Sequence, residues 1–278
     1  MAPRPSDASM NHLLRSHAPI SDAGWQLLDN EARQRLAPAL AARKLVDFAG
    51  PHGWSHSATN LGRTNLLASA PGEGVTGLQR RVLALVEARA DFEVSLEELR
   101  DADRGATDAD LDELARAAHR IAVAENVAVF HGWSGAIAGI TQASPHEPVP
   151  LGGAAEDYPS AVAAAVERLL SSGIAGPYAL ALGAEEHQRV IETAEHGGYP
   201  LLEHLRRILD GPIVWAPGVQ GAVLVSQRGG DFLFDCGQDL SIGYDSHDGQ
   251  VVRLYLQVSF SFQVATPEAA VALVRQAE

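Results

Sequence analysis

The chain has 278 residues, of which 46% are hydrophobic, and this is enough for one large core or two ordinary ones. Its formal net charge of −14 at pH 7 disfavours nucleic acid as a partner, because an acidic surface repels phosphate backbones. Cys236 is its single cysteine, which excludes an intrachain disulfide and a cysteine-based zinc site and favours a reducing cytoplasm.

The N-terminal stretch lacks the continuous apolar run of a secretion signal, and no later window reaches the roughly 18 apolar residues of a membrane span. We therefore expect a cytoplasmic protein that is not embedded in a membrane. Residues 1–9 are rich in Pro, Ser and Ala and are predicted to form a flexible tail.

The first predicted element is an amphipathic helix that begins after Ser21, a good N-cap, and ends or kinks near Pro38. A short strand in "KLVDFAGPHGW" follows it. Residues 50–81 then contain Gly, Pro, Ser, Asn and Thr with only short apolar pairs, which predicts an extended arm without a core of its own. Such an arm needs a partner to become ordered.

A β-compatible run precedes a helix that Ser95 and Glu98 are predicted to cap. A longer helix follows over 111–131, and its apolar stripe includes Glu125. We interpret Glu125 as a buried carboxylate paired with an arginine such as Arg89, rather than as a general base.

Short helices and strands alternate from there to Gln227, which indicates an α/β insertion. The stretch 228–264 then alternates apolar and polar residues over long strands. Such strands must pair with something earlier, so we expect the chain to return to its first block and complete a sheet there.

Two motifs suggest chemistry but lack the context that they need. "GEGVTG" (72–77) has the glycine spacing of a dinucleotide site, but no strand precedes it and no helix follows, so we interpret it as a hairpin tip. "HGWSGA" (131–136) is similar to a nucleophile elbow, yet a helix rather than a strand leads into it, which favours a helix-ending turn. We expect no catalytic residues and hence no enzyme.

His52 and His56 form an H-x-x-x-H pattern, which places two imidazoles on one face only within a helix. Pro51 and Gly53 argue against a helix there. We interpret the pair as loop histidines and expect no metal site.

Several segments, in order and nearly without gaps between about Met10 and Leu273, strongly resemble the encapsulins, which are bacterial and archaeal nanocompartment shell proteins. Among them are "RKLVDFAGPHGW" (43–54), "VFHGWSGAIAGI" (129–140), "RGGDFLFDCGQDLSIGY" (228–244) and "VRLYLQVSFSFQVATPEA" (252–269). The resemblance implies an α+β fold, that of the major capsid proteins of tailed bacteriophages, with a P-domain, an E-loop and an A-domain. It also implies that copies of the chain assemble into an icosahedral shell.

The expected division is a tail at 1–9, the N-terminal helix of the P-domain at 10–49, the E-loop at 50–81, the spine helix of the P-domain at 82–132, the A-domain at 133–226 and the P-domain sheet at 227–278. The family's older names suggest an alternative, a secreted bacteriocin or protease. The lack of a secretion signal and of an assembled catalytic set weighs against it.

The resemblance further implies cargo proteins, such as a dye-decolorising peroxidase or a ferritin-like iron-storage enzyme, which carry a C-terminal targeting peptide. On matching positions, the groove for this peptide would comprise Leu36, Arg43, Leu45, Asp47, Asp239, Ile242 and Tyr244. Aliphatic side chains would take apolar anchors, and Asp47 or Asp239 would pair with a basic residue. The alternative that Leu45 and Ile242 are simply core residues stays open.

The loop "ETAEHGGYP" (192–200) matches the segment that lines the five-fold pore in this family, so Glu195, His196, Gly197 and Gly198 are the pore candidates. A ring of Glu195 would attract cations. Some members bind flavin on a tryptophan whose matching position here is Glu97. A carboxylate cannot stack on the flavin ring as an indole does, so we expect no flavin cofactor.

Overall fold

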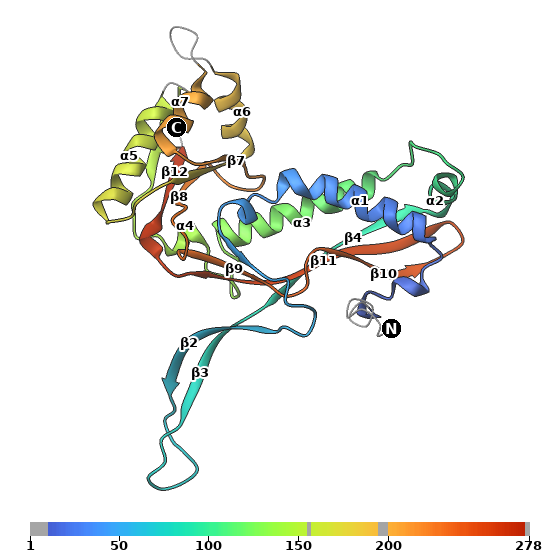
Figure 1. The fold of residues 1–278 in the computed structure, drawn as a ribbon, viewed down its shortest axis with the longest axis horizontal. Coiled ribbons are helices and arrows are strands. Elements are labelled where there is room, and N and C mark those ends of the chain that lie inside the picture. The colour runs from blue at the N-terminus through green and yellow to red at the C-terminus, as the bar shows by residue number, and fades with distance from the viewer. Residues whose placement is uncertain (1–10, 155–156, 194–199, 276–278) are drawn as a thin grey trace, which may run out of the picture.

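The computed structural model describes residues 11–154, 157–193 and 200–275. Its helices and strands form two sheets, each covered by helices, and a long hairpin that projects away from both (Figure 1). The helices are α1 (Asp22–Ala39), α2 (Leu96–Asp103), α3 (Asp112–Phe130), α4 (Ile140–Ala143), α5 (Tyr158–Ser171), α6 (Ala184–Glu192) and α7 (Leu201–Leu209). None of the described helices has the length and continuous apolar run that a membrane span requires.

The first sheet is built around β11 (Val251–Val264). On one side β11 pairs with β10 (Ser241–His247) and, further along, with β9 (Phe232–Cys236). On its other side it pairs with β4 (Val86–Ser95), and all these pairings are antiparallel. The short strand β1 (Asp47–Ala49) adds to β9 in parallel. The prediction that the chain returns to its first block is confirmed, since β11 pairs with β4 over ten residue positions.

Helices α1 and α3 cover this first sheet (Figure 1). Helix α1 begins as predicted, because the Ser21 hydroxyl accepts a hydrogen bond from the Gly24 amide at 2.9 Å. Asn126 on α3 is fully buried and joins α3 to the end of α1 and to the segment before β8. Its side chain accepts from the Ala41 and Ala42 amides, and it donates to the carbonyls of Ala39 and Pro217. The end of α1 is therefore fixed in position by α3.

The second sheet has the strand order β5 (Val149–Leu151), β12 (Ala270–Arg275), β8 (Ala222–Ser226), β6 (Tyr178–Leu182) and β7 (Ile213–Trp215). Helices α5, α6 and α7 pack on it, which agrees with the predicted α/β insertion. One element differs from the expected division: the predicted P-domain sheet at 227–278 includes β12, which pairs with β8 and β5 instead. The chain leaves the first sheet after β11, and β12 then adds to the second sheet between β5 and β8.

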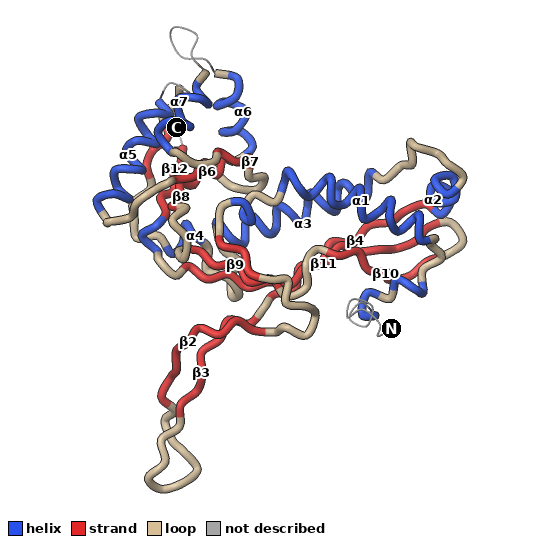
Figure 2. Tube along the Cα trace, viewed as in Figure 1, coloured by secondary structure: helices blue, strands red, loops and turns tan. Residues whose placement is uncertain are grey.

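The hairpin, here called the arm, consists of β2 (Ala58–Leu66), β3 (Leu78–Ala84) and the turn between them. It extends away from both sheets, and strand structure continues along most of its length (Figures 1 and 2). Few of its side chains touch a core, as the sequence predicts for this segment. The 72–77 motif lies in the turn and is followed by β3 rather than by a helix, so it has no dinucleotide geometry.

Two local predictions are corrected. Ser95 does cap α2, but its hydroxyl accepts from the Glu97 amide, and the Glu98 carboxylate instead accepts from the amide of Asp110, so the capping box does not form. Glu125 is buried and paired with an arginine, as predicted, but that arginine is Arg43. The named candidate Arg89 is wrong, because it bonds Asp91 and Asp245 on the exposed face of the first sheet.

Candidate functional site

A groove of about 250 Å³ lies between α1 and the strands β10 and β11. Four of the seven residues predicted to bind a cargo peptide line it together: Leu36, Arg43, Asp239 and Ile242. Ile242 is paired across the sheet with Leu256, which forms part of the groove floor. The groove therefore combines an aliphatic floor with a charged end.

The charged end is organised by Arg43. Its guanidinium donates to both carboxylate oxygens of the buried Glu125, at 2.8 and 2.7 Å, and to Asp239 Oδ1 at 2.6 Å. Arg43 can reach both because the short helix at 42–44, held by Asn126, turns its side chain back over α3. Arg43, rather than Arg89, is thus the partner of Glu125.

The electrostatics of this cluster favour a basic ligand. Burial raises the pKa of Glu125, and the bonds from Arg43 oppose that effect. Arg43 itself is held protonated: burial lowers its pKa, but the two carboxylates outweigh burial and raise it. Because Arg43 is paired bidentately to Glu125, Asp239 is only partly neutralised, and its side chain is 43% exposed. Of this cluster, Asp239 is the charge most exposed to a ligand in the groove, which Asp29 and Arg33 also line.

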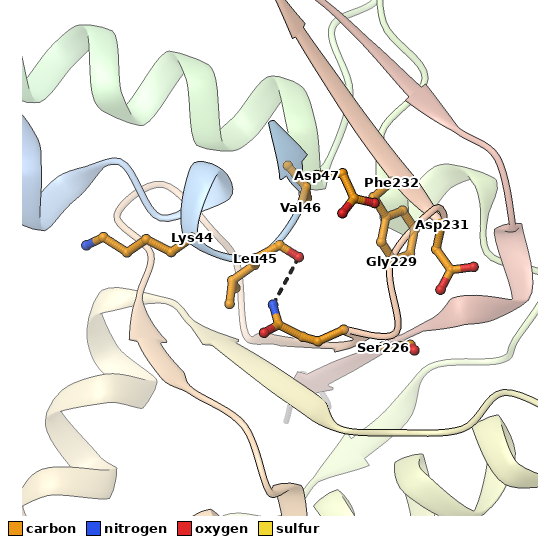
Figure 3. Close-up of a pocket in the computed structure, with 9 residues that line it drawn as sticks. Lys44, Leu45, Val46, Asp47, Ser226, Gly229, Asp231 and Phe232 are labelled. Carbon is orange, nitrogen blue, oxygen red and sulfur yellow. Dashed lines mark hydrogen bonds between the residues drawn. The ribbon is translucent and has the colours of Figure 1, made fainter. Parts of the chain in front are cut away.

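Leu45 and Asp47 lie outside this groove, in a second pocket of about 200 Å³ (Figure 3). The Leu45 side chain is buried, and its carbonyl accepts from the Gln227 amide group at 3.2 Å. The Asp47 carboxylate accepts from the Gly230 amide at 2.6 Å, which fixes the turn before β9. The structure thus separates the predicted set into two places, and the roles of both residues stay predictions.

Tyr244 lies further along β10, where its hydroxyl contacts His247 Nδ1 at 2.6 Å. It packs partly against the core and does not line either pocket. The pore candidates Glu195, His196, Gly197 and Gly198 lie outside the described residues. Their role also stays a prediction.

Seven groove residues were not predicted from the sequence: Asp29, Ala32, Arg33, Ala37, Leu40, Leu240 and Leu256. Those on α1 and at its C-cap could have been found, because Arg33, Leu36, Ala37 and Leu40 follow one another at helical spacing. Leu240 gives no such signal, since it lies in the loop between β9 and β10.

The 131–136 motif is a turn after α3, as the sequence predicts. Helix α3 ends at Phe130, and the chain then forms an isolated bridge between Trp133 and Ile137. A nucleophile elbow needs a strand that leads into the serine, and here a helix leads into it.

Comparison with known proteins agrees with this architecture. The family described as "Encapsulating protein for peroxidase" matches residues 10–261. A type 1 encapsulin shell protein of Rhodospirillum rubrum is 48% identical over 270 residues, which cover 95% of this chain and 96% of the relative. Shell proteins of the same description from Rhodococcus erythropolis and Mycobacterium tuberculosis are 42% and 39% identical, each over 95% of this chain and 100% and 99% of the relative.

Solved structures show the fold alone. A virus-like particle from Pyrococcus furiosus superposes with a TM-score of 0.64 at 16% identity and covers 89% of this chain and 98% of its own. Mycobacterium phage Bobi gives a TM-score of 0.53 at 13% identity, over 86% of this chain and 91% of its own. The α+β fold is therefore that of tailed-phage capsid proteins, as the sequence predicts. The extent and identity of the sequence matches show that the chain belongs to the encapsulin family of shell proteins.

Proposed function

We propose that the chain is the wall subunit of a hollow icosahedral compartment, and that cargo is held inside it by a short C-terminal peptide that lies in the groove between α1 and β10. The proposed shell function is supported by the identity of 39–48% to encapsulin shell proteins over 95% of the chain. The observation that carries the peptide site is the groove, which joins Leu36 and Ile242 to the exposed charge of Asp239.

The arm supplies the physical reason for assembly. Leu66 and Leu78 are directly opposite each other on β2 and β3, and they are 72% and 62% exposed. Burying such a side chain contributes about 1.5–3 kcal/mol. A neighbouring copy that covers the arm recovers this energy. Because the arm touches a different surface of that copy, the contact is heterologous and propagates until the ring of copies closes.

The cargo is a peroxidase in this proposal, because the matching family is described as encapsulating one. A ferritin-like iron-storage enzyme is the second cargo class, which the sequence predicts by resemblance. The peptide should carry two apolar anchors and a basic residue, since the groove offers an aliphatic floor and Asp239.

The groove assignment is tested by filling it. Ala37 lies on the exposed edge of α1 and lines the groove, so Ala37→Trp obstructs it without entering the core. Gln34→Trp is the matched control, because Gln34 is exposed on the same helix but does not line the groove. Shells of each variant are purified with their contents, which mass spectrometry identifies and quantifies.

We expect intact shells from both variants and about tenfold less cargo in Ala37→Trp, because an obstructed pocket loses its apolar anchor contacts. Equal cargo in both variants would place the peptide elsewhere. The sequence also predicts that Asp47→Ala releases cargo from intact cages. Since Asp47 bonds the Gly230 amide, cages that instead fall apart would assign Asp47 to the fold.

Three finer statements belong to the same proposal. The subunit acts as a wall and not as a catalyst, and it encloses protein in the cytoplasm rather than nucleic acid, which the net charge of −14 disfavours. No flavin binds at Glu97, which is an exposed carboxylate in the first turn of α2. A yellow purified shell with flavin absorbance would contradict the last statement.

A further inference from the structure

At the root of the arm, two histidines from one loop meet an aspartate from the first sheet. His52 and His56 lie between β1 and β2, and Asp235 lies in β9. The Nε2 atom of His52 is 2.9 Å from Asp235 Oδ1, and that of His56 is 3.1 Å from Oδ2. One candidate ligand atom of each residue lies within 4.8 Å of the other two. The residues therefore converge although the loop is not helical.

Main-chain contacts hold this loop against the sheet. The His52 amide donates to the Cys236 carbonyl at 3.0 Å, and the Gly53 amide donates to the Gly237 carbonyl at 2.9 Å. The chain can approach so closely because Gly50 has a φ of +109° and a Cβ there would lie 2.4 Å from the Cys236 oxygen. The backbone thus fixes where both imidazoles start, before any side chain contributes.

The carboxylate of Asp235 has one oxygen in use and one that lacks a hydrogen bond. Oδ2 accepts from the Thr59 hydroxyl, which also contacts Ser261 Oγ at 2.5 Å. Oδ1 is buried, and within the described part of the chain no hydrogen bond of proper geometry reaches it, although His52 Nε2 is near. A buried acceptor without a hydrogen bond is costly, and a cation would satisfy it.

The donor set and its spacing suit a metal ion. Ligand atoms at about 2.0–2.2 Å from one cation lie ~3 Å from one another, which is close to the two nitrogen to oxygen separations here. Two imidazoles and a carboxylate suit Zn²⁺ or Fe²⁺. The histidine side chains are 45% and 28% exposed, so remaining coordination positions are open to water. We propose that His52, His56 and Asp235 form a binding site for one divalent transition-metal cation at the root of the arm.

The surroundings favour the ionised, ligating form of the Asp235 carboxylate. Burial raises the pKa of Asp235, but the bonds from Thr59 and His56 and the nearby histidine charges outweigh burial and lower it, so the carboxylate is ionised at neutral pH. Thr59 and Ser261 hold the carboxylate in place, as outer partners of metal ligands do. Since Thr59 lies in β2, a bound cation would tie the loop, the arm and β9 together.

The test uses assembled shells of the full chain, dialysed against a chelator and titrated with Co²⁺. Binding is followed by equilibrium dialysis and by the visible absorption of bound cobalt, with Zn²⁺ as the competitor. The variants are His52→Gln and His56→Gln, which change partly exposed side chains, and Asp235→Asn, whose fold is checked by circular dichroism. His17→Gln is the matched control, because His17 is exposed and belongs to another element.

We expect one Co²⁺ per chain that Zn²⁺ displaces, and at least about tenfold weaker binding in His52→Gln and in His56→Gln. His17→Gln should bind like the parent. If the two loop variants also bind like the parent, or if shells take up no Co²⁺, the proposal is overturned. The cluster is then only a set of ion pairs that holds the loop against β9. Because the two loop variants require no change in the buried carboxylate, this result does not depend on Asp235→Asn folding.

Discussion

The first sheet and the arm are both antiparallel strands, yet they treat apolar side chains in opposite ways. In β4 buried and exposed residues alternate, and β11 is buried along most of its length beneath α3. In β2 and β3 most side chains are exposed, including Leu66 and Leu78. The sheet thus buries its apolar side chains within one chain, whereas those of the arm stay exposed. In the proposed shell, the exposed strands of the arm are where one subunit contacts the next.

The largest expected effect comes from charging the arm. Leu66→Asp with Leu78→Asp removes about 3–6 kcal/mol of burial from each arm contact, or ~10²–10⁴-fold in association. Both positions are exposed, so the single subunit should remain folded. Analytical ultracentrifugation should then find small species in place of shells.

Asn65→Asp with Gln79→Asp is the control for this change, because it places the same two charges on the adjacent exposed pair of β2 and β3. It should assemble, or assemble far better than the leucine variant. If both variants assemble normally, the arm does not carry the contact between subunits.

The second prediction compares the stability cost of removing an arginine from a buried ion pair with that of removing one from exposed pairs. Arg43→Ala leaves Glu125 buried without its cation, and we expect a loss of about 3–5 kcal/mol in the free energy of unfolding. Urea denaturation of the non-assembling arm variant measures this directly. Replacing both partners, as Arg43→Met with Glu125→Leu, should recover most of the loss.

The control here is Arg253→Ala, which breaks two exposed pairs, with Glu93 at 3.1 Å and with Asp248 at 3.0 Å. Its cost should stay below about 1 kcal/mol. An equal cost for the two arginine variants would mean that the Arg43 cluster is no more than a surface ion pair.

A smaller effect is the order in which falling pH destabilises two regions, the end of α3 at His131 and the root of the arm at Asp235. His131, at the end of α3, accepts from the Gln220 amide through Nε2, and burial lowers its pKa from the ordinary 6.5. Its folded form prefers the neutral ring, so its contribution is complete above pH 6.5 and declines as the pH falls below that value. The pKa of Asp235 is lowered from 3.8, so its contribution at the arm root is lost only below pH 3.8.

Thermal melts of the Leu66→Asp, Leu78→Asp variant at a series of pH values should show the two losses in this order. His131→Gln should reduce the decline just below pH 6.5 by a few degrees, since 1 kcal/mol shifts the Tm of a domain of this size by about 2–4 °C. It should not abolish the decline, because burial also lowers the pKa of His187. An unchanged profile of Tm against pH in His131→Gln would show that protonation of His131 does not destabilise the fold.

Local features were predictable from the sequence, and distant pairings were not. The start of α1 followed from Ser21, and the arm followed from its lack of apolar periodicity, because both depend on neighbouring residues. The partner of Glu125 was misassigned, because Arg43 lies 82 residues away and only the fold brings it near. His56 meets Asp235 across 179 residues for the same reason.

The groove was predictable in part. Resemblance to a family identified Leu36 and Ile242 on two elements that the structure does bring together. It also grouped Asp47 with them, although Asp47 bonds the turn before β9. Positions carried over by matching motifs share a neighbourhood, but which cavity each side chain enters depends on packing that the motif does not record.

Electron microscopy of the purified full-length chain, with its mass measured in the same buffer at physiological salt, tests the central claim most directly. If each subunit covers the arm of the next, the particles are uniform hollow spheres built from many copies. If the chain instead stays a discrete small oligomer at high concentration, with its leucine-bearing hairpin folded onto its own surface, the account is contradicted.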